Sequence, residues 1–104
     1  MSSIIPLEEM TLYWALIKKR VSSNRKVNRL VLVLEITEVH TTFVVLESLE
    51  KLDDHSSVMK VEGELKISGL VPQNAALLLE DYLTSSSEVI RDYAIAFLKK
   101  KQQL

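Results

Sequence analysis

The chain contains no cysteine, and only two glycines and two prolines occur among its 104 residues. The lack of cysteine excludes disulfides, thiolate metal sites and cysteine nucleophiles, and it favours a reducing compartment. Domains rich in β-structure usually contain more turn residues than this, so the scarcity of glycine and proline favours helices.

Long hydrophobic runs are also missing. No run exceeds six residues, and runs such as residues 30–34 are far too short to cross a membrane. The N-terminus has no basic start or apolar core of signal-peptide length. We therefore expect a soluble, cytoplasmic protein that does not act at a membrane. A content of 47% hydrophobic and 26% charged residues predicts one folded domain over residues 1–104.

The net charge is only -1, so no overall field points to nucleic acid. The charges are nevertheless separated along the chain. Residues 18–29 contain only basic charges, whereas residues 35–64 are mostly acidic. The basic segment is a candidate for contact with nucleic acid or with an acidic partner, although charges of this kind usually form a solvated surface.

Four segments have apolar residues at helical spacing, and we expect helices over residues 7–21, 43–52, 73–84 and 88–101. Ser85-Ser86-Ser87-Glu88 is typical of a capping box, since Glu88 follows Ser85 by three residues. Trp14 lies on the apolar side of the first segment, so it is expected in the core rather than as an exposed stacking surface.

Two further segments are ambiguous. Residues 27–36 are rich in β-branched side chains, and residues 59–67 alternate between apolar and charged side chains, which taken alone is a strand pattern. However, no Gly, Pro, Asn or Asp lies between Asn28 and Asp53, so a hairpin in this region lacks an obvious turn.

A repeat of 31 residues favours helices for both ambiguous segments. The units are residues 7–37, 38–68 and 69–99. Seven columns of this alignment are apolar in all three units, against roughly three expected by chance at this composition. Arg29, Lys60 and Arg91 form an aligned basic column, and Gly63 aligns with Ala94, which suggests a small residue where two helices approach closely.

The third unit resembles a HEAT repeat, a family related to armadillo repeats. The resemblance is carried by Leu77-Leu78-Leu79, Leu83, Val89, Arg91, Ala94 and Leu98. It implies an all-α fold of three stacked antiparallel helical hairpins, a short α-solenoid, although family units are nearer ~40 residues long. Such stacks are scaffolds that bind partners along the groove lined by their second helices.

The alternative is an α+β fold in the order helix, three strands, two helices. This order is loosely similar to a double-stranded RNA-binding domain. That family carries a lysine cluster at the start of the helix after the strands, and Gln73-Asn74-Ala75 stands there instead.

No arrangement of residues indicates an enzyme, a cofactor or a metal site. His40 and His55 are 15 positions apart, with no spacing typical of metal ligands. Ser85 to Ser87 form a cap rather than a nucleophile, because no motif ties a histidine to them. Catalysis is therefore not expected.

The principal hypothesis is a protein-binding adaptor or subunit, and a homodimer through the apolar residues 27–36 is a further possibility. Its partner is expected on the second helices, at Asn28, Arg29, Lys60, Glu64 and Arg91. The alternative is nucleic-acid binding through the basic segment, with contacts from Lys18, Lys19, Arg20, Arg25 and Lys26.

Overall fold

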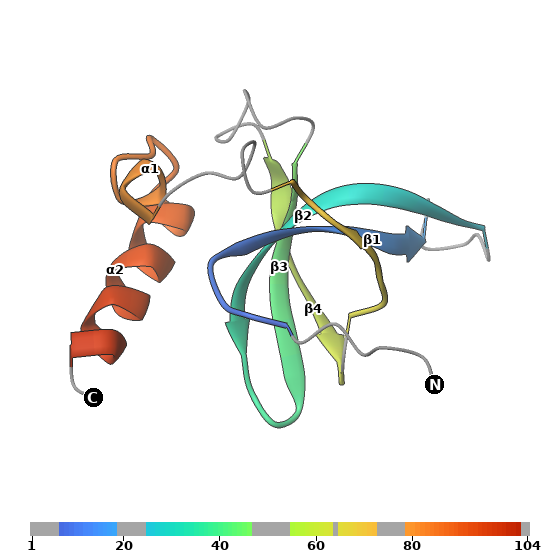
Figure 1. The fold of residues 1–104 in the computed structure, drawn as a ribbon, viewed down its shortest axis with the longest axis horizontal. Coiled ribbons are helices and arrows are strands. Elements are labelled where there is room, and N and C mark those ends of the chain that lie inside the picture. The colour runs from blue at the N-terminus through green and yellow to red at the C-terminus, as the bar shows by residue number, and fades with distance from the viewer. Residues whose placement is uncertain (1–6, 19–24, 47–54, 64, 73–78, 103–104) are drawn as a thin grey trace.

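The structure is a computed structural model, and it describes residues 7–18, 25–46, 55–63, 65–72 and 79–102. These residues form a sheet with two helices beside it (Figure 1). The elements are β1 (Thr11–Lys18), β2 (Lys26–Ile36), β3 (His40–Leu46), β4 (His55–Glu62), β5 (Ile67–Leu70), α1 (Leu79–Leu83) and α2 (Glu88–Gln102).

The all-α prediction is wrong, and with it the HEAT-like solenoid of stacked hairpins. The five strands form one antiparallel sheet in the order β4-β3-β2-β1-β5. The units 7–37, 38–68 and 69–99 are not equivalent, since the first holds β1 and β2 while the third ends in α2. The α+β alternative is closer, but its first helix is strand β1.

The sheet is curled around strand β2. The first part of β2 pairs with β1, from Lys26 to Val33, and the later part pairs with β3, from Leu30 to Ile36. The β2–β3 register shifts between Val33 and Glu35, which marks a bulge that bends the strand. Figure 1 accordingly shows β1 crossing the direction of β3.

The curl gives the sheet two buried faces, which explains the apolar run at residues 30–34. Successive side chains of a strand point to opposite faces, so a strand buried on both sides needs continuous apolar sequence. On the outer face, Leu30, Leu32 and Leu34 pack with the helices. On the concave face, Val31 and Val33 pack with a second cluster of buried side chains: Tyr13, Ala15, Phe43 and Leu65.

Helix α2 packs on part of the outer face through Ile90 and Ala94. Figure 1 shows α2 beside the sheet. The helix predicted over residues 88–101 is therefore present. Its cap is Ser87 rather than Ser85, because the Ser87 hydroxyl accepts a hydrogen bond from the Ile90 amide at 3.4 Å. Of the helix predicted over residues 73–84, the later part is present as α1, Leu79–Leu83. Residues 73–78 lie outside the described part.

The turn between β2 and β3 needs no glycine, proline, asparagine or aspartate. The Thr37 hydroxyl accepts hydrogen bonds from the amides of Val39 at 3.4 Å and His40 at 3.0 Å. The Thr37 amide donates to the His40 carbonyl at 2.9 Å. A threonine side chain thus replaces the expected turn residues, which is why the sequence predicted no hairpin here.

Gly63 does not lie between helices. It follows β4 with a φ of +72°, a conformation that glycine adopts at little cost. A Cβ placed there would meet nothing within 4 Å in the part of the chain that the structure describes. Its amide donates to the Val39 carbonyl at 3.0 Å, and its carbonyl accepts from the Thr41 hydroxyl at 2.9 Å. Gly63 therefore ends β4 with a turn.

Candidate functional site

The structure does not bring the predicted partner-binding residues together. Asn28 and Arg29 are neighbours on β2 and so point to opposite faces, while Lys60 lies on β4. Arg91 lies on α2, where its Nη1 donates to the Ser85 carbonyl at 3.1 Å. Glu64 lies outside the described residues. The aligned basic column is therefore not a ladder on one surface.

The basic segment spans the hairpin of β1 and β2. Lys18 and Lys26 are opposite each other at the end of the paired strands. Arg25 and Lys26 are exposed. Lys19 and Arg20 lie outside the described residues. The structure thus keeps two of the predicted nucleic-acid contacts, Arg25 and Lys26, on the surface.

Strand β4 forms one edge of the sheet. Among the described residues no strand pairs with the side of β4 that faces away from β3. Val58 lies opposite Val44 on the outer face, and Met59 lies opposite Phe43 on the concave face. These two side chains are 36% and 38% exposed, so the edge presents apolar surface on both faces.

Strand β5 forms the other edge and differs from β4 in length. It has four residues against eight, it contains Gly69, and its register with β1 is irregular. A short, irregular edge strand offers few main-chain groups to a partner, which protects it from pairing. Leu70, at its end, is 59% exposed.

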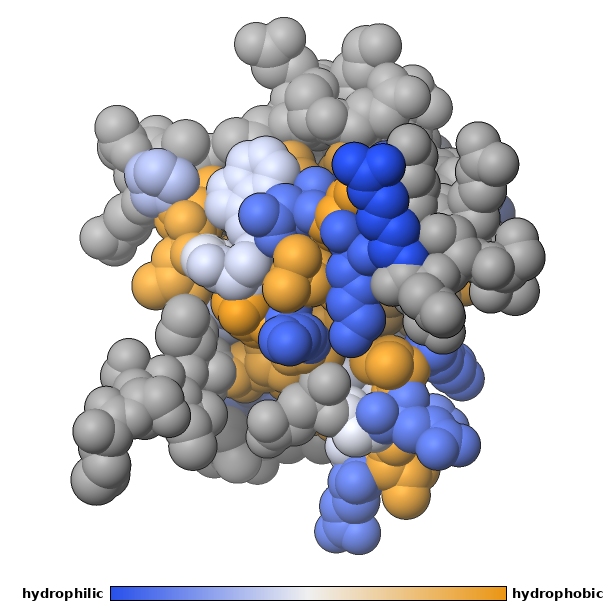
Figure 2. Space-filling model, turned by 90° about the vertical axis from the view of Figure 1, so that its right-hand side faces the viewer, coloured by the Kyte–Doolittle hydropathy of each residue, from blue (hydrophilic) through white to orange (hydrophobic). Residues whose placement is uncertain are grey.

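The outer face of the sheet has a second half that the helices leave open. We call this half the Trp14 face. The strand pairing and the hydrogen bond from the Leu16 amide to the Lys66 carbonyl place five residues on it: Trp14, Leu16, Lys26, Asn28 and Lys66. Contrary to the expectation that it belongs to the core, Trp14 is 42% exposed. Figure 2, which views the molecule from the side where β1 ends and β2 begins, shows hydrophilic side chains gathered beside hydrophobic ones.

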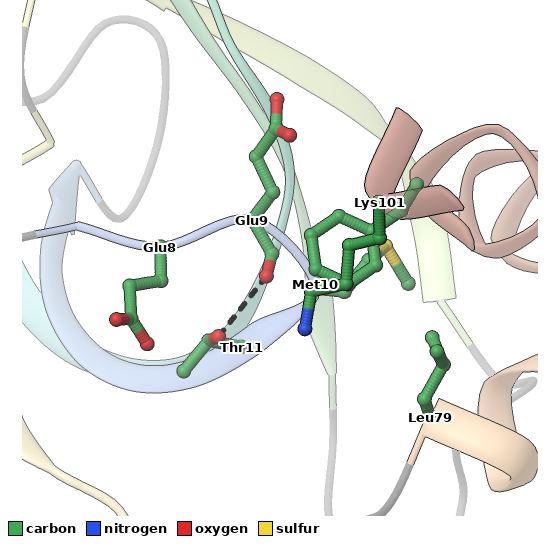
Figure 3. A pocket seen from close by; sticks show the side chains of 7 residues that line it. Glu8, Glu9, Met10, Thr11, Leu79 and Lys101 are labelled. Atoms are coloured by element: carbon green, nitrogen blue, oxygen red, sulfur yellow. Dashed lines mark hydrogen bonds between the residues drawn. The ribbon is translucent and has the colours of Figure 1, made fainter. Parts of the chain in front are cut away.

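A pocket of about 480 Å³ lies between the start of β1 and the two helices (Figure 3). It is lined by Glu8, Glu9, Met10, Thr11, Leu79, Phe97 and Lys101. Figure 3 shows the Glu9 carboxylate turned away from Leu79, which lies across the pocket from Met10. Met10 has a φ of +54°, unusual for a residue with a side chain.

Most charged groups of this pocket already have partners within the molecule. The Glu9 carboxylate accepts from the Ile36 amide at 2.9 Å and from Lys100 Nζ at 3.1 Å. The Lys101 ammonium lies 5.0 Å from the centre of the Phe97 ring. The pocket is therefore better described as a seam that joins β1 to α2 than as a site for a ligand.

The described residues contain no group of three or more His, Asp or Glu side chains arranged to hold a metal ion. Burial raises the pKa of the Tyr13 and Tyr82 hydroxyls above the ordinary value of 10.0. Both tyrosines belong to the two cores, so neither shift marks an exposed reactive group. No described helix has the length and apolar content needed to span a bilayer.

Comparison of the chain with known protein families, curated proteins and solved structures finds no match. The edge of β4 and the Trp14 face therefore have to be interpreted from their own residues.

Sequence reasoning missed both surfaces because it assigned their strands to helices. The alternation of residues 59–67 contained the signal for an edge strand, since its charged positions interrupt apolar ones. Taken as a strand, the same pattern places Lys60 and Glu62 on one face and Met59 and Val61 on the other. The sequence contains no comparable signal that would predict whether Trp14 is exposed or buried.

Proposed function

We propose that this chain is a protein-binding subunit that adds an extended segment of another protein to its sheet at strand β4. The observation that carries the proposal is the open edge of β4, where Val58 and Met59 are exposed on opposite faces. In this mode of recognition main-chain hydrogen bonds supply affinity, and alternate side chains supply specificity.

The side chains of β4 define the segment that fits. Met59 and Val61 lie on the concave face, opposite Phe43 and Thr41, so apolar residues of the partner would extend that core. Lys60 and Glu62 lie on the outer face and are exposed. A partner segment with an acidic residue opposite Lys60 and a basic residue opposite Glu62 is favoured, because like charges directly opposite each other destabilise a strand pair.

The same charges explain why the edge is selective rather than generally adhesive. Exposed edge strands promote aggregation when they are long, flat and wholly apolar, and a lysine on the edge counteracts this. In β4 the charged residues Lys60 and Glu62 lie on either side of Val61. A partner segment therefore has to place complementary charges opposite them, because otherwise pairing would bury an unpaired charge.

The proposal is tested by selecting peptides from a displayed library of random decapeptides against the whole chain. Met59→Lys places a charge on the concave side of the edge, whereas Ile95→Lys places the same charge on α2 at a residue of matching exposure, 39%. We expect peptides with alternating apolar residues to bind the original chain and the Ile95→Lys variant, and to bind the Met59→Lys variant at least about tenfold more weakly.

Peptides that bind Met59→Lys as tightly as the original chain would contradict the proposal. Light scattering on the chain alone gives a second check. A dimer that becomes a monomer on Met59→Lys substitution would show that the natural occupant of the edge is a second copy of this chain and not another protein.

A further inference from the structure

The Trp14 face lies near the edge of the sheet that is farthest from β4, and it shares no residue with the β4 edge. The register places Trp14 opposite Leu30 of β2 and Gly69 of β5, on the outer face. Two positions further along, Leu16 lies opposite Asn28, and the Leu16 amide donates to the Lys66 carbonyl at 3.0 Å. Lys26 follows on the same face of β2.

Trp14 is 42% exposed, and the structure leaves space beside it over β5. On one side its cross-strand neighbour is Gly69, which has no side chain, and a Cβ built there would meet no atom of the described residues within 4 Å. The two helices cover the other half of the outer face, around Leu32 and Leu34, and leave Trp14 partly exposed. A flat group of a ligand therefore has room to lie beside the indole over β5.

The charged residues that share the Trp14 face, within the described part of the chain, are lysines. Lys26 and Lys66 are exposed, and in the described part of the chain neither takes part in an ion pair. Strands β1 and β5 contain no acidic residue, and the acidic residue of β2, Glu35, lies at its far end. The Trp14 face thus combines an aromatic surface with two lysines, Lys26 and Lys66, that form no ion pair within the described residues.

We infer that the Trp14 face binds single-stranded nucleic acid, with one base stacked on the Trp14 indole and neighbouring phosphates held by Lys26 and Lys66. Positions on the same face of a strand repeat every ~7 Å, so the face from Trp14 to Lys26 has room for only a few nucleotides. A base has a flat face whatever its identity, so binding of this kind depends little on sequence.

Other anions fit the patch less well. An acidic peptide pairs with the two lysines but offers no flat group to the indole. In a duplex the faces of the bases are stacked on one another, so the indole gains nothing unless the duplex opens. Single-stranded nucleic acid uses both features of the patch at once.

Trp14 is the only tryptophan of the chain, so its fluorescence reports the site directly. We expect a twelve-nucleotide oligothymidylate to quench this fluorescence at low salt, and the affinity to fall steeply as salt is added. Trp14→Leu is expected to weaken the binding of a dye-labelled oligothymidylate at least about fivefold, which is the effect of losing one stacked base.

Lys66→Gln and Lys26→Gln test the phosphate contacts. Each is expected to weaken binding and to reduce the slope of log affinity against log salt by about one. Lys99→Gln, which makes the same change of charge on α2, is the matched control and should leave the slope unchanged. A circular dichroism spectrum like that of the original chain shows that each variant is folded.

The inference is overturned if millimolar oligothymidylate causes no quenching at low salt, if a duplex of the same length binds with equal affinity, or if polyglutamate quenches equally. None of these results concerns β4, and failure of the β4 proposal leaves this test unaffected. A loss of binding in Lys99→Gln equal to that in Lys66→Gln would likewise contradict the site, since it would show general attraction to positive charge.

Discussion

Two tyrosines show how burial changes the chemistry of single residues in this protein. Tyr13 is buried in the concave core and Tyr82 in the core beneath the helices. Removal from water disfavours the ionised phenolate, so burial raises the pKa of both hydroxyls, most strongly that of Tyr82, and the Asp81 carboxylate adds to the rise at Tyr82. As a consequence, the free energy of unfolding is expected to decrease at alkaline pH.

We predict that the contribution of Tyr82 to the free energy of unfolding is fully present below about pH 10 and is lost as the pH rises above it. In the unfolded chain tyrosine ionises near 10.0, whereas in the folded chain the pKa of Tyr82 is raised, so the folded state holds the proton longer. Denaturation by urea at a series of pH values measures this loss.

Tyr82→Phe is expected to reduce the alkaline loss without abolishing it, because the raised pKa of Tyr13 acts in the same direction. At neutral pH the same substitution should change the stability by less than about 1 kcal/mol, since it removes only a hydroxyl. Tyr93→Phe, at a half-buried position on α2, is the control. An unchanged alkaline slope in Tyr82→Phe would show that Tyr82 does not contribute.

At the scale of elements, glycine is required at one of the two positions that carry it. Gly63 turns the chain after β4 with a positive φ, whereas Gly69 lies in β5 without one. We predict that Gly63→Ala destabilises the protein by about 1 kcal/mol, because a Cβ is strained in this conformation. Gly69→Ala should change the stability by less than about half of that, as its Cβ meets no neighbour among the described residues.

Urea denaturation of the two glycine variants measures the difference, and equal effects would mean that the backbone of residue 63 is not held in the left-handed region. Because Gly69 is the cross-strand neighbour of Trp14, Gly69→Ala also tests the space beside the indole. We expect weaker binding of oligothymidylate together with the small change in stability given above.

Much of the strand content was present in the local sequence patterns. The β-branched residues 27–36 and the alternating residues 59–67 correspond to β2 and to parts of β4 and β5. The 31-residue repeat overrode them, and it was misleading because strands and helices separated by polar turns at similar intervals also align their apolar residues. Chance coincidence of apolar columns is high in a chain with 47% hydrophobic residues.

Strand β1 was the hardest element to predict. Leu12 contributes to the outer core, and Tyr13 and Ala15 contribute to the concave core, so both faces of the strand carry apolar residues. When nearly every position is apolar, a helical period can be selected as readily as an alternating one. Burial on both faces depends on the tertiary curl of the sheet, which local sequence does not contain.

At the scale of the whole molecule, an ion pair joins segments that are far apart in the sequence. Lys100 near the end of α2 pairs with Glu9, which precedes β1, at 3.1 Å. The Glu9 carboxylate also accepts from the Ile36 amide at the end of β2. One carboxylate thus connects the N-terminal segment, the sheet and the C-terminal helix.

We predict that Glu9→Ala costs more stability than Lys100→Ala. The lysine side chain is 64% exposed, so water screens the pair and its loss should cost less than about 1 kcal/mol. The glutamate side chain is 15% exposed, and its loss also leaves the Ile36 amide without this acceptor, for a cost of about 1 to 3 kcal/mol. Urea denaturation of both variants gives the comparison, and equal costs would show that the amide contact contributes nothing.

The two proposed surfaces lie at separate places on the sheet, the β4 edge for a protein strand and the Trp14 face for single-stranded nucleic acid. The curl keeps them apart, since β4 and β1 are separated by β3 and β2. A helical interpretation of the chain could not predict either surface, because both are defined by the pairing of strands.

The claim on which the account of function depends is that β4 accepts a strand. Hydrogen exchange of the whole chain, with and without a peptide selected against it, tests this claim most directly, because an added strand must protect backbone amides on the open edge. We predict that the peptide slows the exchange of backbone amides over residues 55–62 and leaves the exchange of residues 67–70 in β5 unchanged. Protection confined to β5, or to the pocket residues of α2, with β4 unchanged, would contradict it.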